Sequence, residues 1–186
     1  NTVVVFWSDH GYYMGEHTWW GAKHNNYEGA TRNALIIATP DQKTAGQTTD
    51  ALVQSVDLAP TLTELCGLPA SAGFQGRSLK PVLDDPATAV NEGAFSWYPK
   101  GGYLGVAMRT DNWRFVRWTK AGVPPVYELY DSIRDPQNNV NLADRPDHRE
   151  LIASLSTQLL ARFPVQEFRP PPAEPVNKPK KQARAR

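Results

Sequence analysis

The chain has 186 residues, of which 40% are hydrophobic, and a formal net charge of +1, which suits one domain with room for a small second one. Residues 169–186 carry six Lys or Arg against one Glu, so a mildly acidic body precedes a basic, proline-rich tail. No apolar run approaches the ~18–20 residues of a membrane span. The tail lacks interleaved aromatics, so we expect a solvated terminus with neither a membrane nor a nucleic-acid partner.

Residues 1–39 predict a strand, a long loop, a short helix and a second strand. "TVVVFW" at residues 2–7 has the composition of a strand buried on both faces, and "NALIIAT" at residues 33–39 is its one good partner. The helix is expected at residues 26–32, capped by Asn25 or Asn26. This order predicts a right-handed parallel crossover. Because two strands do not make a stable parallel sheet, we expect the C-terminal piece of a larger domain.

The loop after the first strand reads "SDHGYYMGEHTWWGAK" and concentrates chemically capable groups. Asp9 and His10 follow the carboxyl end of the strand, where open α/β sheets form their sites, and both can reach one metal ion. Lys23 suits an anionic oxygen group. A metal and a lysine together favour phosphoryl or sulfuryl transfer, whereas the alternative is a polar turn. Glu16 and His17 are expected to support the loop.

Two further pairs in this region have simple structural interpretations. Glu28 and Arg32 lie one helical turn apart and predict an i,i+4 ion pair. Trp19 and Trp20 either line a pocket or pack beneath the loop.

Residues 55–66 predict a helix, with Ser55 or Asp57 able to cap it. Its apolar stripe consists of Leu58, Leu62 and Leu65. Cys66, the single cysteine, lies on that stripe and is expected in the core. A short helical turn with Leu79, Val82 and Leu83 packing inward follows.

From about Glu92 the pattern changes to short aromatic and β-branched segments separated by turns. "GAFSWYP", "LGVAMRTD", "WRFVRWT" and "VYELYDS" predict a four-stranded antiparallel meander with a hairpin turn at Asp111-Asn112. Its aromatic side chains Trp97, Tyr98, Tyr103 and Trp113 either shape a cleft or pack between the sheet and the helix at its back, and we expect packing for most of them. An amphipathic closing helix follows, with an apolar side of Leu151, Leu155, Leu159 and Leu160.

Several of these motifs resemble the type I sulfatases of the alkaline-phosphatase superfamily. They are "VVVFWSDHGYYMGEH…WGAKHNNYEGATRNALII" and "SVDLAPTLTELCGLPASAGFQGRSLKPVL". "AFSWYPKGGYLGVAMRTDNWRFVRW" and "ELYDSIRDPQNNVNLAD" are similar to the C-terminal subdomain, particularly of iduronate-2-sulfatase-like members. The resemblance covers residues 1–163 and implies an α/β fold. Residues 1–90 would be the C-terminal part of an alkaline-phosphatase-like sandwich, and residues 91–168 an antiparallel four-stranded subdomain with a closing helix. Residues 169–186 would be a disordered tail.

The same resemblance implies a calcium ion and a formylglycine nucleophile made from a Cys or Ser. Asp9 and His10 match two metal-ligand positions, and Lys23 matches the lysine that contacts the sulfate ester. Tyr12 matches a position that can face substrate, and His17 belongs with it as a weaker substrate-side candidate. The implied substrate is a sulfated carbohydrate, and the implied location is periplasmic or extracellular.

The chain departs from the family pattern in three respects. The spacing from His17 to Lys23 is one residue longer than usual, which makes His24 an alternative to Lys23. The nucleophile motif C/S-x-P/A-x-R is absent, because no arginine follows Cys66 at the required spacing. The two acidic metal ligands of the family's N-terminal region are absent too.

We therefore expect a fragment that needs an N-terminal half to complete its fold and is inactive alone. One alternative is a phosphodiesterase or phosphonate monoester hydrolase of the same superfamily. Another is a non-catalytic glycan-binding remnant.

Overall fold

The computed structural model describes residues 1–164, and the tail expected at residues 169–186 lies outside the described part. The strands are β1 (Val4–Trp7), β2 (Tyr13–Met14), β3 (Trp20–Ala22), β4 (Leu35–Ala38), β5 (Ala94–Lys100), β6 (Tyr103–Arg109), β7 (Trp113–Lys120) and β8 (Val123–Asp131). The α-helices are α1 (Glu28–Thr31), α2 (Leu58–Leu65), α3 (Lys80–Asp84) and α4 (Arg149–Arg162), and the 3₁₀ turns are η1 (Glu16–Thr18), η2 (Ser55–Asp57) and η3 (Pro146–His148).

The pairing of the first and last strands of residues 1–39 differs from our prediction. β1 and β4 pair antiparallel, with Val4 opposite Ala38 and Trp7 opposite Leu35, so the predicted parallel crossover is wrong. The segment between β1 and β4 starts and finishes at the same end of the strand pair. There Ser8 N donates to the Ala34 carbonyl (3.0 Å) and Ala34 N donates to Ser8 Oγ (3.1 Å). β2, η1, β3 and α1 all lie in this connection.

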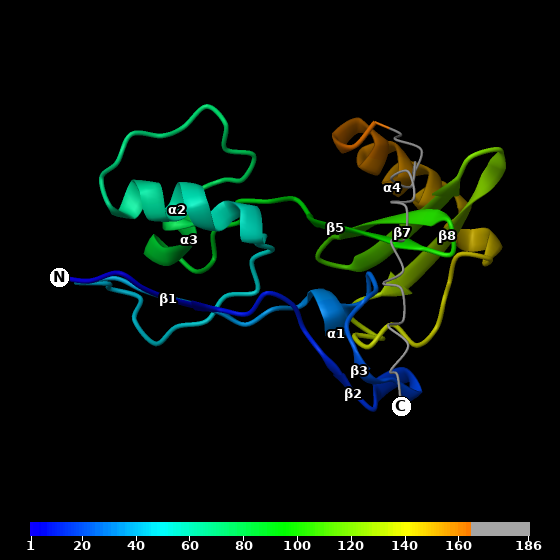
Figure 1. The fold of residues 1–186 in the computed structure, drawn as a ribbon, viewed down its shortest axis with the longest axis horizontal. Coiled ribbons are helices and arrows are strands. Elements are labelled where there is room, and N and C mark those ends of the chain that lie inside the picture. The colour runs from blue at the N-terminus through cyan, green and yellow to red at the C-terminus, as the bar shows by residue number, and fades with distance from the viewer. Residues whose placement is uncertain (165–186) are drawn as a thin grey trace, which may run out of the picture.

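The β1–β4 pair carries large apolar side chains that this chain leaves exposed. Val4, Phe6 and Ile36 have exposed fractions of 57%, 61% and 63%. In Figure 1 the pair extends away from the four-stranded sheet, with α2 and α3 beside it. The burial on both faces that the sequence predicts is therefore not provided by residues 1–164.

The α2–α3 region is organised around a buried carboxylate. Asp57 is fully buried and accepts hydrogen bonds from Gln54 N (2.8 Å), Arg77 N (2.8 Å) and Asn91 Nδ2 (2.9 Å). The helical stretch begins with η2, whose N-cap is Gln54 and not the expected Ser55 or Asp57. Asp57 is the third residue of the capping box, makes no side-chain cap bond to α2, and also fixes the following loop. Cys66, however, is exposed, because it follows the last residue of α2 and lies beyond the buried turn. Its predicted core position is wrong.

Strands β5 to β8 form the predicted antiparallel meander in sequential order, with the hairpin turn at Asp111-Asn112. One face packs on α4 through Met108, Phe115 and Leu129, which meet Ile152, Leu155 and Leu159 in a buried core. The expected α/β class, four-stranded subdomain and closing helix are thus confirmed. Within residues 1–164 no helix is long and apolar enough to cross a membrane.

The opposite face of this sheet packs on the connection between β1 and β4. Strand register places Ser96, Ala107, Val116 and Glu128 in one row on that face, and Arg114 beside Tyr130. Figure 1 shows α1, β2 and β3 on the side of the sheet away from α4. The sheet therefore lies between α4 and the segment that carries the candidate site.

Candidate functional site

Asp9 and His10 lie directly after β1, at the end where β4 begins. Asn33 Nδ2 donates to the Asp9 carbonyl (3.2 Å), which fixes the backbone of the turn against the strand that returns. The Asp9 side chain is 84% exposed and the His10 side chain 31%. The carboxylate is therefore available to a ligand, and the imidazole is half enclosed.

The hydrogen bonds of His10 define which ring nitrogen carries the proton and which carries the lone pair. Nδ1 lies 2.7 Å from the Gly11 carbonyl oxygen, which can only accept, so Nδ1 carries the proton of the neutral ring. Nε2 then has a lone pair, and Lys23 Nζ donates to it at 2.8 Å. Asp9 Oδ2 lies 3.4 Å from the same Nε2. The three residues that the sequence singled out thus converge, and Lys23 rather than His24 occupies the position beside His10.

Asp9 and His10 have the donor chemistry of a partial metal site. An exposed carboxylate and a ring nitrogen lie side by side, and the other ring nitrogen is bonded to a carbonyl, as is usual for metal-ligating histidines. Within residues 1–164 no group of three or more His, Cys, Asp and Glu side chains could hold a metal ion. Two donors are too few for a metal site, so the described residues supply at most part of one.

The loop of residues 8–23, here the motif loop, lies so close to α1 that two of the contacting positions have no room for a Cβ. A Cβ on Gly11 would lie 2.0 Å from the Gly29 carbonyl oxygen, and a Cβ on Gly29 would lie 2.6 Å from the Tyr13 ring. Gly11 N donates to the Ala30 carbonyl at 2.8 Å. Glycine is thus required at residues 11 and 29 to seat the Asp9-His10 turn against α1.

Tyr12 and His17 occupy different environments. The Tyr12 side chain is 53% exposed, and its ring lies nearly parallel to His10 with centroids 6.4 Å apart, so it faces the solvent next to the candidate site. His17 Nε2 instead lies 2.7 Å from the Gln137 carbonyl oxygen, in the loop after β8. His17 also has a left-handed backbone (φ 53°), which is uncommon outside glycine. This placement agrees with a supporting role for His17.

Glu16 also supports the loop. Its carboxylate accepts a hydrogen bond from Met14 N (2.8 Å), and this bond lowers the pKa of Glu16. Trp19 is half-buried and stacks on Tyr27, whereas Trp20 is 76% exposed.

Glu28 does not form the predicted pair with Arg32. Helix α1 ends at Thr31 and Arg32 has an extended backbone, so the i,i+4 geometry is lost. The Glu28 carboxylate instead pairs with the buried Arg114 guanidinium, and Arg109 Nε lies 3.6 Å from it. Burial lowers the pKa of Arg114, and Glu28 opposes that shift.

Sequence reasoning also missed how the start of α1 is held. The Glu28 amide donates to Asn138 Oδ1 (3.1 Å), so the helix is capped by a residue of the distant loop after β8. Asn25 and Asn26 were the expected caps, but the N-cap residue is Tyr27. Asn26 is 1% exposed and bonds to the four-stranded sheet. An Asn before a helix resembles a cap in sequence, so no local signal could have revealed this.

Tyr27 joins the motif loop to the sheet through an aromatic and acidic cluster. Its ring stacks on His17 and Trp19, and its hydroxyl donates to Glu128 Oε1 at 3.2 Å. Tyr130 donates to the other oxygen of Glu128 (3.2 Å). Burial, followed by the Glu128 charge, raises the pKa of Tyr27 to about 12. The tyrosine is therefore a protonated donor at neutral pH.

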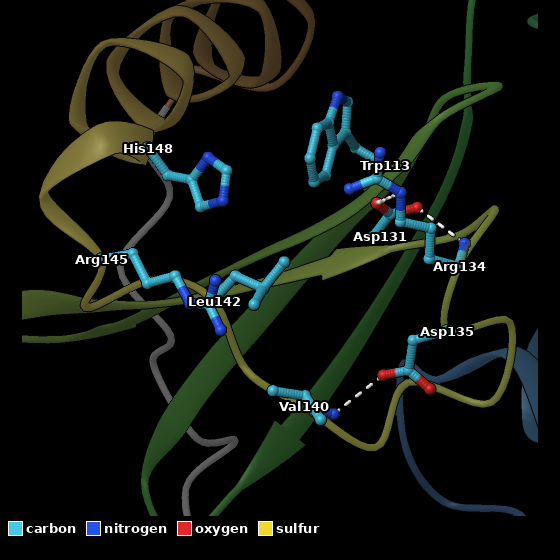
Figure 2. A pocket seen from close by; sticks show the side chains of 8 residues that line it. All are labelled: Trp113, Asp131, Arg134, Asp135, Val140, Leu142, Arg145 and His148. Carbon is cyan, nitrogen blue, oxygen red and sulfur yellow. Dashed lines mark hydrogen bonds and ion pairs between the residues drawn. The ribbon is translucent and has the colours of Figure 1, made fainter.

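A hollow of about 210 Å³ lies elsewhere, between β7, β8 and η3. Figure 2 shows Trp113 and His148 at its upper side, Asp131 and Arg134 at the right, and Val140 and Asp135 below. Both carboxylates are already used: Asp131 accepts from the Ile133 and Arg134 amides, and Asp135 from the Val140 amide. None of the sequence-predicted site residues lines it, so it is a feature of turn packing rather than the candidate site.

Comparison with known proteins decides the family. The family model for N-sulphoglucosamine sulphohydrolase, C-terminal, matches residues 15–163. The chain belongs to the sulfatase family. The match starts within the motif loop and runs to the end of α4, so the resemblance read from the sequence is confirmed.

Similar proteins agree with this assignment. The chain is 32% identical over 159 residues to a sulfatase of Formosa agariphila, covering 86% of this chain and 30% of that protein. It is 31% identical over 156 residues to an N-acetylglucosamine-6-O-sulfatase of Bacteroides thetaiotaomicron, covering 80% and 27%. The chain thus spans less than a third of the length of these two relatives.

Solved structures extend the likeness to the fold. BT4656 in complex with its substrate D-glucosamine-2-N,6-O-disulfate matches with a TM-score of 0.73 and 26% identity, over 87% of this chain and 35% of that one. The phosphonate monoester hydrolase of Silicibacter pomeroyi matches with the same TM-score and identity, over 86% and 34%. The fold is therefore shared by enzymes of both kinds.

Proposed function

We propose that the full-length protein that carries this chain hydrolyses sulfate esters of a sulfated carbohydrate. The observation that carries the proposal is the convergence of three groups in a chain of the sulfatase family. Lys23 Nζ lies 2.8 Å from His10 Nε2, and Asp9 Oδ2 lies 3.4 Å from the same nitrogen. Two relatives support the substrate class, since one is named for N-acetylglucosamine-6-O-sulfate and the other binds a glucosamine disulfate.

Each of the three residues has a distinct proposed task. Lys23 binds a sulfate oxygen through its ammonium group and stabilises the charge that develops there in the transition state. Asp9 and His10 would be two ligands of a calcium ion, which supplies charge neutralisation next to the ester oxygen. The Nδ1–H bond of His10 to Gly11 leaves the lone pair on Nε2. In this chain that lone pair accepts from Lys23 Nζ, so His10 would bind the ion only once Lys23 turns to the sulfate. Tyr12, exposed beside His10, borders the sugar.

The remaining parts of such an enzyme would come from outside these 186 residues. We assign the nucleophile, expected to be a formylglycine, and the other metal ligands to the portion of the relatives that this chain does not span. The chain alone should then be inactive. By family resemblance, we also propose a periplasmic or extracellular location.

The test is a hydrolysis assay of the full-length gene product on glucosamine-6-O-sulfate and on the generic ester 4-nitrophenyl sulfate. Lys23→Ala should lower kcat/KM by about 10²–10³-fold, the usual effect of removing one oxyanion donor. Lys43→Ala removes an exposed lysine of a surface loop and should leave kcat/KM within about 2-fold.

Metal dependence gives a second readout. Chelation should abolish activity, and calcium should restore it in the wild type but not fully in Asp9→Asn. Asp111→Asn, an exposed hairpin carboxylate, is the matched control and should behave as wild type. Full activity of Lys23→Ala, or of the 186-residue chain alone, would overturn the proposal.

A phosphonate monoester hydrolase remains the main alternative, because such an enzyme shares the fold at 26% identity. Phenylphosphonate in the same assay separates the two: a kcat/KM higher than that for the sulfate ester would favour the alternative. A non-catalytic glycan-binding protein would bind sulfated sugar with no turnover, and binding would survive the double change of Asp9 and Lys23.

A further inference from the structure

We propose that Asn26 is a positioning residue for Lys23 and that the four-stranded sheet sets the location of the sulfate-binding ammonium group through it. This inference rests on the proposed function of Lys23. It concerns the site linker, which we define as residues 23–27, between β3 and α1.

Asn26 connects the site linker to three strands of the sheet. Its Nδ2 donates to the Gly105 carbonyl of β6 at 2.9 Å, and its Oδ1 accepts from Ser96 Oγ of β5 at 2.9 Å. Its own carbonyl accepts from Arg114 Nη1 of β7 at 2.7 Å. Asn26 is only 1% exposed, and Arg114 only 3%. These bonds are shielded from water, so breaking one leaves a buried polar group unsatisfied.

The neighbours of Asn26 in the chain are held to the same face of the sheet. The His24 ring stacks on Tyr98 of β5, with centroids 5.9 Å apart and 14° between the ring planes. Tyr27 donates its hydroxyl to Glu128 of β8. Asn25 N donates to the Lys23 carbonyl at 3.1 Å, so a tight turn joins Lys23 to this attached stretch. A shift of Asn26 is therefore transmitted to the Lys23 backbone.

Asn26 is a polar residue at a buried position of this attachment, where an apolar residue would be the ordinary choice. A buried apolar residue would fill the same space, but it could not bond to Gly105 and Ser96 together. The Gly105 carbonyl belongs to strand β6, which pairs with β5 and β7 at this residue, and a Cβ there would lie 2.5 Å from the Trp118 ring. The amide thus gives a directional contact three residues from the group that would bind sulfate, where a displacement of about 1 Å can cost about 100-fold in rate.

The decisive experiment is a double-mutant cycle in the full-length gene product with 4-nitrophenyl sulfate. Asn26→Leu should lower kcat/KM by about 10–100-fold in the wild type and raise the inhibition constant for inorganic sulfate. In the Lys23→Ala background the same substitution should change kcat/KM by less than about 2-fold, because Asn26 acts through Lys23. A loss of folded protein would lower kcat equally in both backgrounds and leave the sulfate inhibition constant unchanged.

A milder variant keeps the inference testable if Asn26→Leu fails to fold. Ser96→Ala removes one bond to Asn26 and should lower kcat/KM by about 3–10-fold, again only when Lys23 is present. Thr119→Val is the matched control, since it removes a hydroxyl bond to the Leu104 carbonyl on the same sheet without touching Asn26. It should have an effect below about 2-fold.

The outcomes separate this inference from the proposed function. If Lys23→Ala is impaired and the Asn26 and Ser96 effects multiply with it, Asn26 is merely structural and only this inference fails. If Lys23→Ala retains full activity, the proposed role of Lys23 fails, and the inference fails with it.

Discussion

The β1–β4 pair and the β5–β8 sheet contain similar apolar residues but bury them very differently. In the sheet, Phe115 and Leu129 have exposed fractions of 0%. In the two-stranded pair, Phe6 and Ile36 are more than 60% exposed. The sheet has α4 on one face and the candidate-site segment on the other, whereas the pair has no comparable layers among residues 1–164. The sheet, buried on both faces, thus supports the segment that carries the candidate site, whereas the β1–β4 pair leaves apolar side chains exposed within residues 1–164.

The largest effect that tests this difference in burial is the loss of stability when one phenylalanine in each region is changed to alanine. Phe115→Ala should lower the free energy of unfolding by about 3–5 kcal/mol, because it leaves a cavity in the closed core against α4. Phe6→Ala should cost less than about 1 kcal/mol in this chain, since its ring is already largely in water. Urea denaturation measures both. Equal losses would contradict the comparison, and a larger Phe6 loss in the full-length protein would show that another layer covers β1.

The second test addresses the ion pair between Glu28 of α1, in the connection from β1 to β4, and Arg114 of the sheet. Arg114→Met should cost about 3 kcal/mol of unfolding free energy, because it removes the buried partner of Glu28 and the donor to the Asn26 carbonyl. Much of this loss should be recovered when Glu28→Gln is added, which a double-mutant cycle detects. Arg134→Met is the control, since that side chain is 89% exposed, and it should change stability by less than about 1 kcal/mol.

Alkaline pH should weaken the attachment of the motif loop to the sheet. The pKa of Tyr27 is raised to about 12 in the fold, against 10.0 as its ordinary value. The unfolded chain therefore ionises first, so the stabilisation is complete below pH 10 and falls as pH rises toward 12. Denaturation midpoints measured from pH 8 to 11.5 should decline less steeply in Tyr27→Phe than in the wild type. Identical pH slopes would argue against a buried Tyr27 hydroxyl.

The smallest expected effect is at Cys66. Because its thiol is exposed after the end of α2, it should react with a thiol reagent in the native protein at a rate close to that of the denatured chain. Cys66→Ser should shift the unfolding free energy by no more than about 0.5 kcal/mol. A protected thiol, or a loss of several kcal/mol, would restore the core position that the sequence predicted.

The local sequence predicted secondary structure correctly where a residue pattern repeats along one helix or strand. Alternation and turn residues located all four strands of the meander, and a 3.6-residue period located the closing helix. The Asp9-His10 turn could be predicted because a strand end and its polar neighbours are adjacent in sequence. Cys66 was misplaced because helical periodicity continues in a sequence for one residue after the helix itself has ended.

The sequence by itself thus determined the element types, the sulfatase family and the residues that meet near His10. Only the tertiary structure decided that β1 and β4 run antiparallel, that Glu28 pairs with Arg114, and that Asn26 joins the site linker to the sheet. The reason is physical. Helix and strand patterns reflect neighbours within a few residues, whereas Glu28 and Arg114 lie 86 residues apart. Their contact exists only once the register of β7 brings the guanidinium to the face of the sheet that supports the site.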